Sequence, residues 1–313
     1  LVRCPEHGIK MVKLEGVPVI HPDVTVYEVR KGRKRVGTFY FDPYAREGKR
    51  SGAWMDQHRS QERFRENITP VISNQCNFVK GKPGEPVLIS WDDAVTLFHE
   101  FGHALHGLMS NVTYPSLSGT AVKRDWVELP SQLNERWVMT RELLKKFALH
   151  YKTGEPISDE LVAKLNKART FNMGFDRVEF LASGLYDMKV HLAATPDKPI
   201  NAGDFERATM AELGCPKEIV MRHRPTQFGH IFSGDGYAAG YYCYLWADAI
   251  VADAAEAFDE AGYYHRATCK RLHDTIISVG NSVAPEQAYR NFRGRDIDAQ
   301  ALMRYLGFDV VAN

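Results

Sequence analysis

Hydrophobic and polar residues alternate along the early part of the chain, with the period of a half-buried β-strand. The alternation runs over residues 17–41 and is clearest in the segments VTVYEV and RVGTFYF. The KGRK segment between them contains a glycine and has the length of a hairpin turn. We therefore predict a small antiparallel β-sheet near the N-terminus.

From Ser90 onward, the apolar residues recur at the three- and four-residue spacing of helices. The predicted helices cover residues 91–108, 128–150, 158–193, 203–213, 240–261, 266–279 and 285–305. Short breaks separate them, and none is a long linker rich in Pro, Gly or Ser. We therefore expect one mostly α-helical domain over residues 1–313, with a β-containing part at 1–89 and a helical part at 90–313.

The composition is typical of a soluble globular protein, with 44% hydrophobic and 25% charged residues. Lys and Arg total 40 and Asp and Glu total 39, so the net charge of +1 does not favour a nucleic-acid partner. No apolar run approaches the length of about 20 residues that spans a bilayer, and LVRCPEHGIK lacks the layout of a secretory signal. The five cysteines form no CxxC pair, which favours a reducing compartment. We expect a cytoplasmic protein with no membrane partner.

The predicted helix at 91–108 has clear ends. Ser90 followed by Asp93 is an N-terminal capping pattern, and Gly107 lies where a helix of about four turns would stop. Six apolar residues share one stripe of this helix: Ala94, Leu97, Phe98, Phe101, Leu105 and Leu108. The three histidines of the helix gather on roughly the opposite side. One face is therefore expected to pack, and the other to present imidazoles.

His99, Glu100 and His103 form an HExxH pattern, in which two imidazoles one turn apart converge on one zinc ion. Chance alone would produce about 0.03 such patterns in a chain of this composition. We predict one Zn²⁺ per chain, with Glu100 as the general base. His106 lies about 10.5 Å beyond His99 along the helix axis, too far for both to bind one ion. We expect it to support the ligands or to lie at the surface.

Zinc needs a third protein ligand from another segment. The segment RDWVELPSQLNERW starts the next predicted helix and offers Asp125, Glu128 and Glu135 as acidic candidates. Spacing alone does not choose among them.

Four segments stand in the order LFHEFGHALHGL, LSGT, RDWVELPSQLNERW and FGHIFSGDGYAAGYYCYLWADAI. With HPDVTVYEV, FYFDPYAREGKRSGAWM and FRGRDIDAQALMRYLGF, they resemble the thimet oligopeptidase family of zinc metallopeptidases, and within it the bacterial peptidyl-dipeptidases most. The resemblance covers nearly the whole chain. It implies an HExxH zincin-type helical catalytic domain, and it implies that Glu128 is the third metal ligand, because Glu128 falls on the glutamate of the family's VExPSQ motif.

The resemblance also implies roles for side chains in the segment 230–244. His230, Tyr237 and Tyr244 match the family's catalytic histidine and tyrosines near the scissile bond, and Tyr241 matches a substrate-side tyrosine. From the residues alone, the apolar GYYCYLW segment is more typical of a buried helix start.

The glycines of this segment, Gly234 and Gly236 among them, would let a loop close over the substrate. Removal of dipeptides from a free C-terminus also needs a cationic anchor for the terminal carboxylate, about two residues beyond the scissile bond. Arg222, Arg224 and His230 lie just before the tyrosines and are candidates, although a solvated surface charge is at least as good an interpretation of each arginine.

The expected function is zinc-dependent hydrolysis of short peptides, with release of C-terminal dipeptides. Two alternatives stay open: an endo-acting oligopeptidase of the same family, and a truncated remnant that binds zinc or peptide without turnover. Known members carry an additional N-terminal helical region that closes one wall of a channel over the zinc. That region is absent from this sequence, so we expect either the missing region or a second chain to complete the channel.

Overall fold

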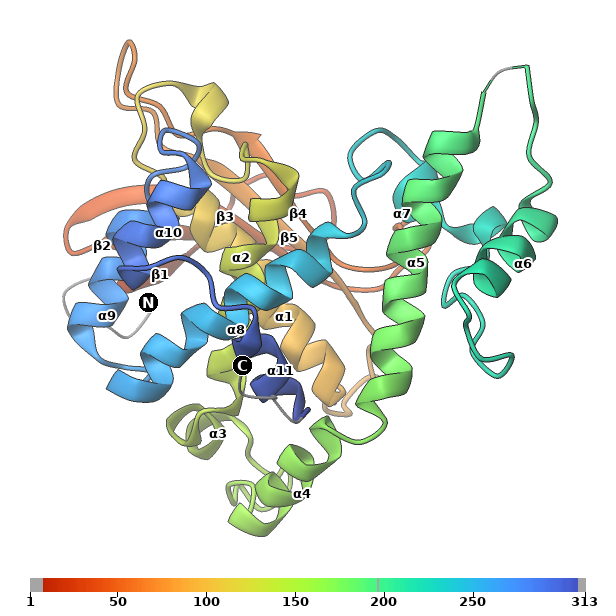
Figure 1. The fold of residues 1–313 in the computed structure, drawn as a ribbon. Helices are drawn as coiled ribbons and strands as arrows, with labels where there is room; N and C mark the ends of the chain where they lie inside the picture. The colour runs from red at the N-terminus through yellow and green to blue at the C-terminus, as the bar shows by residue number, and fades with distance from the viewer. Residues whose placement is uncertain (1–7, 196, 309–313) are drawn as a thin grey trace. The chain divides into compact units, whose positions relative to one another are not determined.

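The computed structural model describes residues 8–195 and 197–308. The chain divides into two compact units. The first unit contains Leu1–Lys123, Val127–Ile157 and Ile250–Ala299, and the second contains Arg124–Trp126, Ser158–Ala249 and Gln300–Asn313. Figure 1 shows the elements of both units along the chain.

A five-stranded sheet lies in the first unit, in the order β1-β2-β3-β5-β4. Its strands are β1 (Ile9–Leu14), β2 (Thr25–Lys31), β3 (Lys34–Tyr44), β4 (Trp54–Arg59) and β5 (Val71–Phe78). The predicted hairpin is confirmed as β2 and β3, which pair antiparallel up to Lys31 and Lys34. Gly32 in the turn has a φ of 60°, a conformation that glycine adopts without steric cost.

The sheet near the N-terminus is confirmed, but it is mixed and not purely antiparallel. β3 and β5 run parallel, while the other neighbours are antiparallel. The chain leaves β3, forms β4 at the edge and returns antiparallel to it as β5, between β4 and β3. This long-range placement cannot be read from the alternation within one hairpin.

The first unit contains helices α1 (Trp91–Leu108), α3 (Arg141–Phe147), α9 (Arg266–Leu272) and α10 (Pro285–Arg293), with short helical segments η1 (Pro115–Leu117), η2 (Arg136–Met139) and η4 (His273–Ile277). α1 packs against β3, β4 and β5. Phe101 of α1 meets Phe39 of β3 edge to face, with ring centroids 5.6 Å apart. The sheet therefore supports one side of α1.

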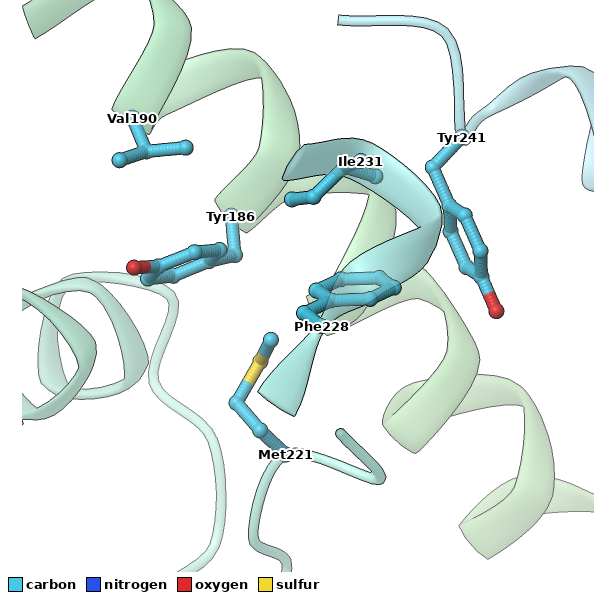
Figure 2. Packing of buried hydrophobic residues seen from close by; sticks show 6 residues of the cluster. All are labelled: Tyr186, Val190, Met221, Phe228, Ile231 and Tyr241. Atoms are coloured by element: carbon cyan, nitrogen blue, oxygen red, sulfur yellow. The ribbon is translucent and has the colours of Figure 1, made fainter. Parts of the chain in front are cut away.

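The second unit contains α4 (Asp159–Arg169), α5 (Met173–Ala193), α6 (Ala202–Glu212), η3 (Pro225–Gln227), α7 (Gly229–Phe232) and α11 (Gln300–Leu306). Two helices have residues in both units, α2 (Arg124–Glu135) and α8 (Cys243–Ala261). Figure 2 shows the second unit's hydrophobic cluster, which joins Tyr186 and Val190 of α5 to Phe228, Ile231, Met221 and Tyr241. Among the residues that the structure describes, no helix is long and apolar enough to cross a membrane.

The predicted helix at 91–108 matches α1, but three longer predicted helices are interrupted. The helix at 128–150 breaks because Thr140 adopts an extended conformation between η2 and α3. The helix at 158–193 breaks at Asn172, which is left-handed with a φ of 55°. The helix at 285–305 breaks at Gly294, a left-handed C-cap. These interruptions leave the apolar spacing largely intact, so periodicity alone did not reveal them.

Candidate metal centre and active site

α1 begins with the predicted capping box. The Ser90 side chain accepts a hydrogen bond from the Asp93 backbone N–H, and the Asp93 side chain accepts one from the Ser90 N–H, each at 3.0 Å. These two bonds satisfy backbone donors that a helix start otherwise leaves unpaired. The cap sets where the helix starts and therefore which residues share its faces.

Two histidines of α1 and one glutamate of α2 form a compact group. Glu128 Oε2 lies 3.2 Å from His99 Nε2 and 3.1 Å from His103 Nε2. One potential ligand atom from each residue lies within 4.8 Å of the others, and no other such group occurs among residues 8–195 and 197–308. The set of two imidazole nitrogens and one carboxylate oxygen is that of a zinc site with a fourth position open.

Close packing of α1 on α2 brings Glu128 to the histidines. A Cβ on Gly102 would lie 2.5 Å from Ser131 Cα and 2.7 Å from Pro130 O, so only glycine permits this approach. The Ser131 hydroxyl lies 3.1 Å from Glu128 Oε2 and donates to it. Asn134 Nδ2 donates to the carbonyl of Phe98 at 2.7 Å. α2 is thus held against the histidine side of α1.

Of the three acidic candidates, Glu128 joins the histidines and Glu135 contacts one of them from outside. His99 Nδ1 lies 2.7 Å from Glu135 Oε1, which directs Nε2 toward the group. Burial lowers the pKa of His99, but its hydrogen bonds to Glu128 and Glu135 outweigh burial and raise the pKa to about 10. Asp125 is outside the group.

Glu100 is only 5% exposed, and its Oε2 atom has no hydrogen-bond partner among the described residues. Burial raises the pKa of this carboxyl group. A buried carboxylate oxygen without a partner beside a metal-ligand set fits a group that exchanges a proton with water or substrate.

His106 is fully buried, so the surface position considered for it is wrong. Burial and the nearby His103 lower its pKa to about 3, which keeps the imidazole neutral. Of the three histidines of α1, His99 and His103 meet Glu128, whereas His106 is enclosed by protein. His106 is outside the metal-ligand group.

The second unit brings together His230, Tyr237 and Tyr244. His230 Nε2 lies 2.8 Å from the Tyr244 hydroxyl, and the Tyr237 and Tyr244 rings stack with centroids 5.5 Å apart. Arg124, which the sequence did not single out, has its guanidinium 4.4 Å from the centre of the Tyr237 ring. Its place in the RDWVEL segment was the available signal. We call His230, Tyr237 and Tyr244 the tyrosine cluster.

Tyr241 differs from these three because it is a core residue. It is 4% exposed and packs with Phe228 in the cluster of Figure 2. Burial raises the pKa of its hydroxyl. The apolar character of the GYYCYLW segment explains this burial, and a substrate contact by Tyr241 stays a prediction.

The remaining substrate-side candidates lie in different surroundings. Arg222 is exposed, with its guanidinium 5.4 Å from the centre of the Phe180 ring, whereas Arg224 forms an ion pair with Glu206 at 3.0 Å. Neither Gly234 nor Gly236 has a positive φ. The left-handed residue of this loop is Ala239, with a φ of 52°.

Comparison with known proteins reveals relatives that are more than twice as long. The model of the family described as "Peptidase family M3" matches residues 7–308 of this chain. The dipeptidyl carboxypeptidase of Escherichia coli (strain K12) is 41% identical over 305 residues, covering 97% of this chain and 44% of that protein. Oligopeptidase A of the same strain is 38% identical over 309 residues, covering 96% of this chain and 45% of that protein.

Among solved structures, the one titled "BsuCP Crystal Structure" superposes with a TM-score of 0.50 at 14% identity, covering 75% of this chain and 50% of that one. At this identity the likeness concerns the fold alone.

Proposed function

Because this chain belongs to peptidase family M3, we propose that it carries the centre of a zinc-dependent peptidase that releases C-terminal dipeptides from short peptides. The observation that supports this function best is the group of His99, His103 and the buried Glu128. Beside it, one oxygen of Glu100 has no hydrogen-bond partner among the described residues. These residues lie close together although the two helices that carry them are separate in sequence.

In this proposal, His99, His103 and Glu128 hold the zinc, and Glu135 orients His99 through its Nδ1 atom. A zinc ion there would polarise the scissile carbonyl and make water a stronger acid. Glu100 takes the proton of the attacking water and passes it to the leaving amine.

The tyrosine cluster supplies the other group that the reaction needs. As the peptide carbonyl is attacked, negative charge develops on its oxygen, and a hydroxyl of Tyr237 or Tyr244 donates a hydrogen bond to it. His230 holds the Tyr244 hydroxyl at 2.8 Å, so the donor is oriented before the substrate binds.

The metal assignment is tested by elemental analysis of the purified protein. One zinc per chain is expected in the wild type, and loss of zinc in His103→Ala. His106→Leu is the matched control, because His106 lies one turn further along α1 and outside the ligand group. Full zinc occupancy in His103→Ala would refute the assignment.

The position of the cut is tested with a free-acid pentapeptide and its C-terminal amide. Release of a C-terminal dipeptide, with much slower cleavage of the amide, is expected for a peptidyl-dipeptidase. Arg222 is the better candidate anchor for the carboxylate, because Arg224 is already paired with Glu206. Equal cleavage of both peptides, or internal cuts, would support the endo-acting alternative. No cleavage by zinc-loaded protein would support the non-catalytic remnant.

We also propose that the part of M3 peptidases that this sequence does not contain covers α5. Six large apolar side chains of this helix are exposed: Phe175, Val178, Leu181, Leu185, Met188 and Leu192. Their spacing of three or four residues places most of them on one stripe, roughly opposite the buried Tyr186 and Val190. A helix that is apolar on two opposite faces is typical of a protein interior.

This second proposal is tested by adding the preceding segment of the E. coli dipeptidyl carboxypeptidase to the protein as a separate chain. Slower amide hydrogen exchange along α5 is expected, and it should be abolished by Leu185→Glu with Leu192→Glu. Unchanged exchange in the wild type would show that this segment does not bind here.

A further inference from the structure

Asp187 of α5 is a fully buried carboxylate that binds the backbone of the segment between Tyr237 and Tyr244. Its Oδ1 accepts a hydrogen bond from the Ala239 N–H, and its Oδ2 accepts one from the Tyr241 N–H, each at 2.9 Å. His191 Nδ1, one turn further along α5, lies 2.8 Å from Oδ1. The charge is thus removed from water but surrounded by donors, which is the condition for burying a carboxylate.

The segment that Asp187 binds has an unusual backbone. Ala239 is left-handed with a φ of 52°, a conformation in which its Cβ approaches the following carbonyl oxygen. Such a residue persists only where the surroundings hold it. The bonds from its own N–H and from the Tyr241 N–H to one carboxylate provide that restraint.

Anchoring at Ala239 and Tyr241 affects the two tyrosines on either side. Tyr237 lies two residues before the first anchor, and its carbonyl accepts from the Gly240 N–H at 2.9 Å. Tyr244 lies three residues after the second, at the start of α8. α5 also lies close to this segment at Gly184, where a Cβ would be in ordinary van der Waals contact with Tyr242 Cα, at 3.6 Å.

We propose that Asp187 is a positioning residue, which holds the left-handed turn at Ala239 so that the hydroxyls of Tyr237 and Tyr244 point where the reaction needs them. The consequence for catalysis rests on the proposed peptidase function. The anchoring itself does not, and it can be measured in protein with no activity. A carboxylate is required because two N–H groups need two acceptor oxygens, whereas an asparagine offers one oxygen and a competing donor.

The test compares Asp187→Asn with the wild type by amide hydrogen exchange and by steady-state kinetics on the free-acid pentapeptide. In the wild type, the amides of Ala239 and Tyr241 should exchange much more slowly than that of Asp235 in the same loop. In Asp187→Asn this protection should be lost. A roughly 10- to 100-fold fall in kcat is expected, with KM and zinc content nearly unchanged, because a donor displaced by about 1 Å can cost about that much in rate.

Asp253→Asn is the matched control. Asp253 is also a fully buried carboxylate, but it binds Tyr289 and Arg295 in the first unit. This variant should lose thermal stability while keeping kcat at temperatures where it is folded. An equal fall in kcat for both variants would contradict the positioning role and show that Asp187 only stabilises the fold.

Other outcomes are also decisive. Rapid exchange of the Ala239 and Tyr241 amides in the wild type would overturn the anchor, even if the Asp187 variant does not fold. Lost protection with an unchanged kcat would overturn the positioning role. If the wild type cleaves no peptide, the peptidase proposal fails, and the exchange measurements still decide whether Asp187 anchors the loop.

Discussion

Gly102 offers a direct test of how the metal centre is assembled. It lies in α1 between His99 and His103, at the point where the backbone of α2 comes closest. An alanine there would place its Cβ 2.5 Å from Ser131 Cα, whereas ordinary van der Waals contact begins at 3.4 Å. The clash is with backbone, so it cannot be relieved by turning a side chain. The helices must separate by about 0.5 Å to reach 3.0 Å, the closest approach that real Cβ atoms show, and by 0.9 Å to reach ordinary contact.

This separation would move Glu128 away from the two imidazoles. Ligand distances in a metal site tolerate deviations of only about 0.2 Å, so a shift several times larger should weaken zinc binding by about 10- to 100-fold. Alanine favours helix over glycine by about 1 kcal/mol, but overpacking typically costs about 1–3 kcal/mol. We expect Gly102→Ala to lower both the free energy of unfolding and the affinity for zinc.

The assay is a zinc titration against a competing chelator, together with denaturant unfolding of the zinc-free protein. Gly174→Ala in α5 is the control, because a Cβ there meets nothing within 4 Å. That substitution should leave zinc affinity unchanged and alter stability by at most about 1 kcal/mol, in the favourable direction. Wild-type zinc affinity in Gly102→Ala would refute the reasoning that close helix packing positions Glu128.

Three further predictions concern single side chains. Glu100→Gln should keep its zinc and lose at least ~100-fold in turnover, because it removes the base and not a ligand; near-normal turnover would contradict this role. Tyr244→Phe should reduce kcat by roughly 10- to 1,000-fold without loss of zinc, and an unchanged rate would leave Tyr244 as a packing residue. Burial and the nearby Glu100 raise the pKa of the Cys76 thiol to about 12. In native protein at pH 8, iodoacetamide should therefore label the partly exposed Cys215 and spare Cys76, as peptide mass spectrometry can determine.

The sequence by itself determined the features that depend on near neighbours. The capping residues, the extent of α1 and the HExxH pattern all follow from spacings of three or four residues, which the geometry of one helical turn converts into shared faces. The hairpin of β2 and β3 is equally local, because its turn residues and alternation are adjacent in the chain. The prediction of Glu128 as the third metal ligand came from the family resemblance, because spacing alone did not distinguish it from Asp125 and Glu135.

Only the tertiary structure decided the features that join distant residues. Asp187 accepts hydrogen bonds from amides 52 and 54 positions away. Neither the position of Asp187 in the sequence nor its residue type predicts these partners. His106 is buried although its helix face is polar, and Tyr241 is buried as a member of the hydrophobic cluster of Figure 2. The parallel pair of β3 and β5 likewise depends on where the chain returns. Local pattern specifies which face a side chain occupies, whereas packing between segments determines what that face meets.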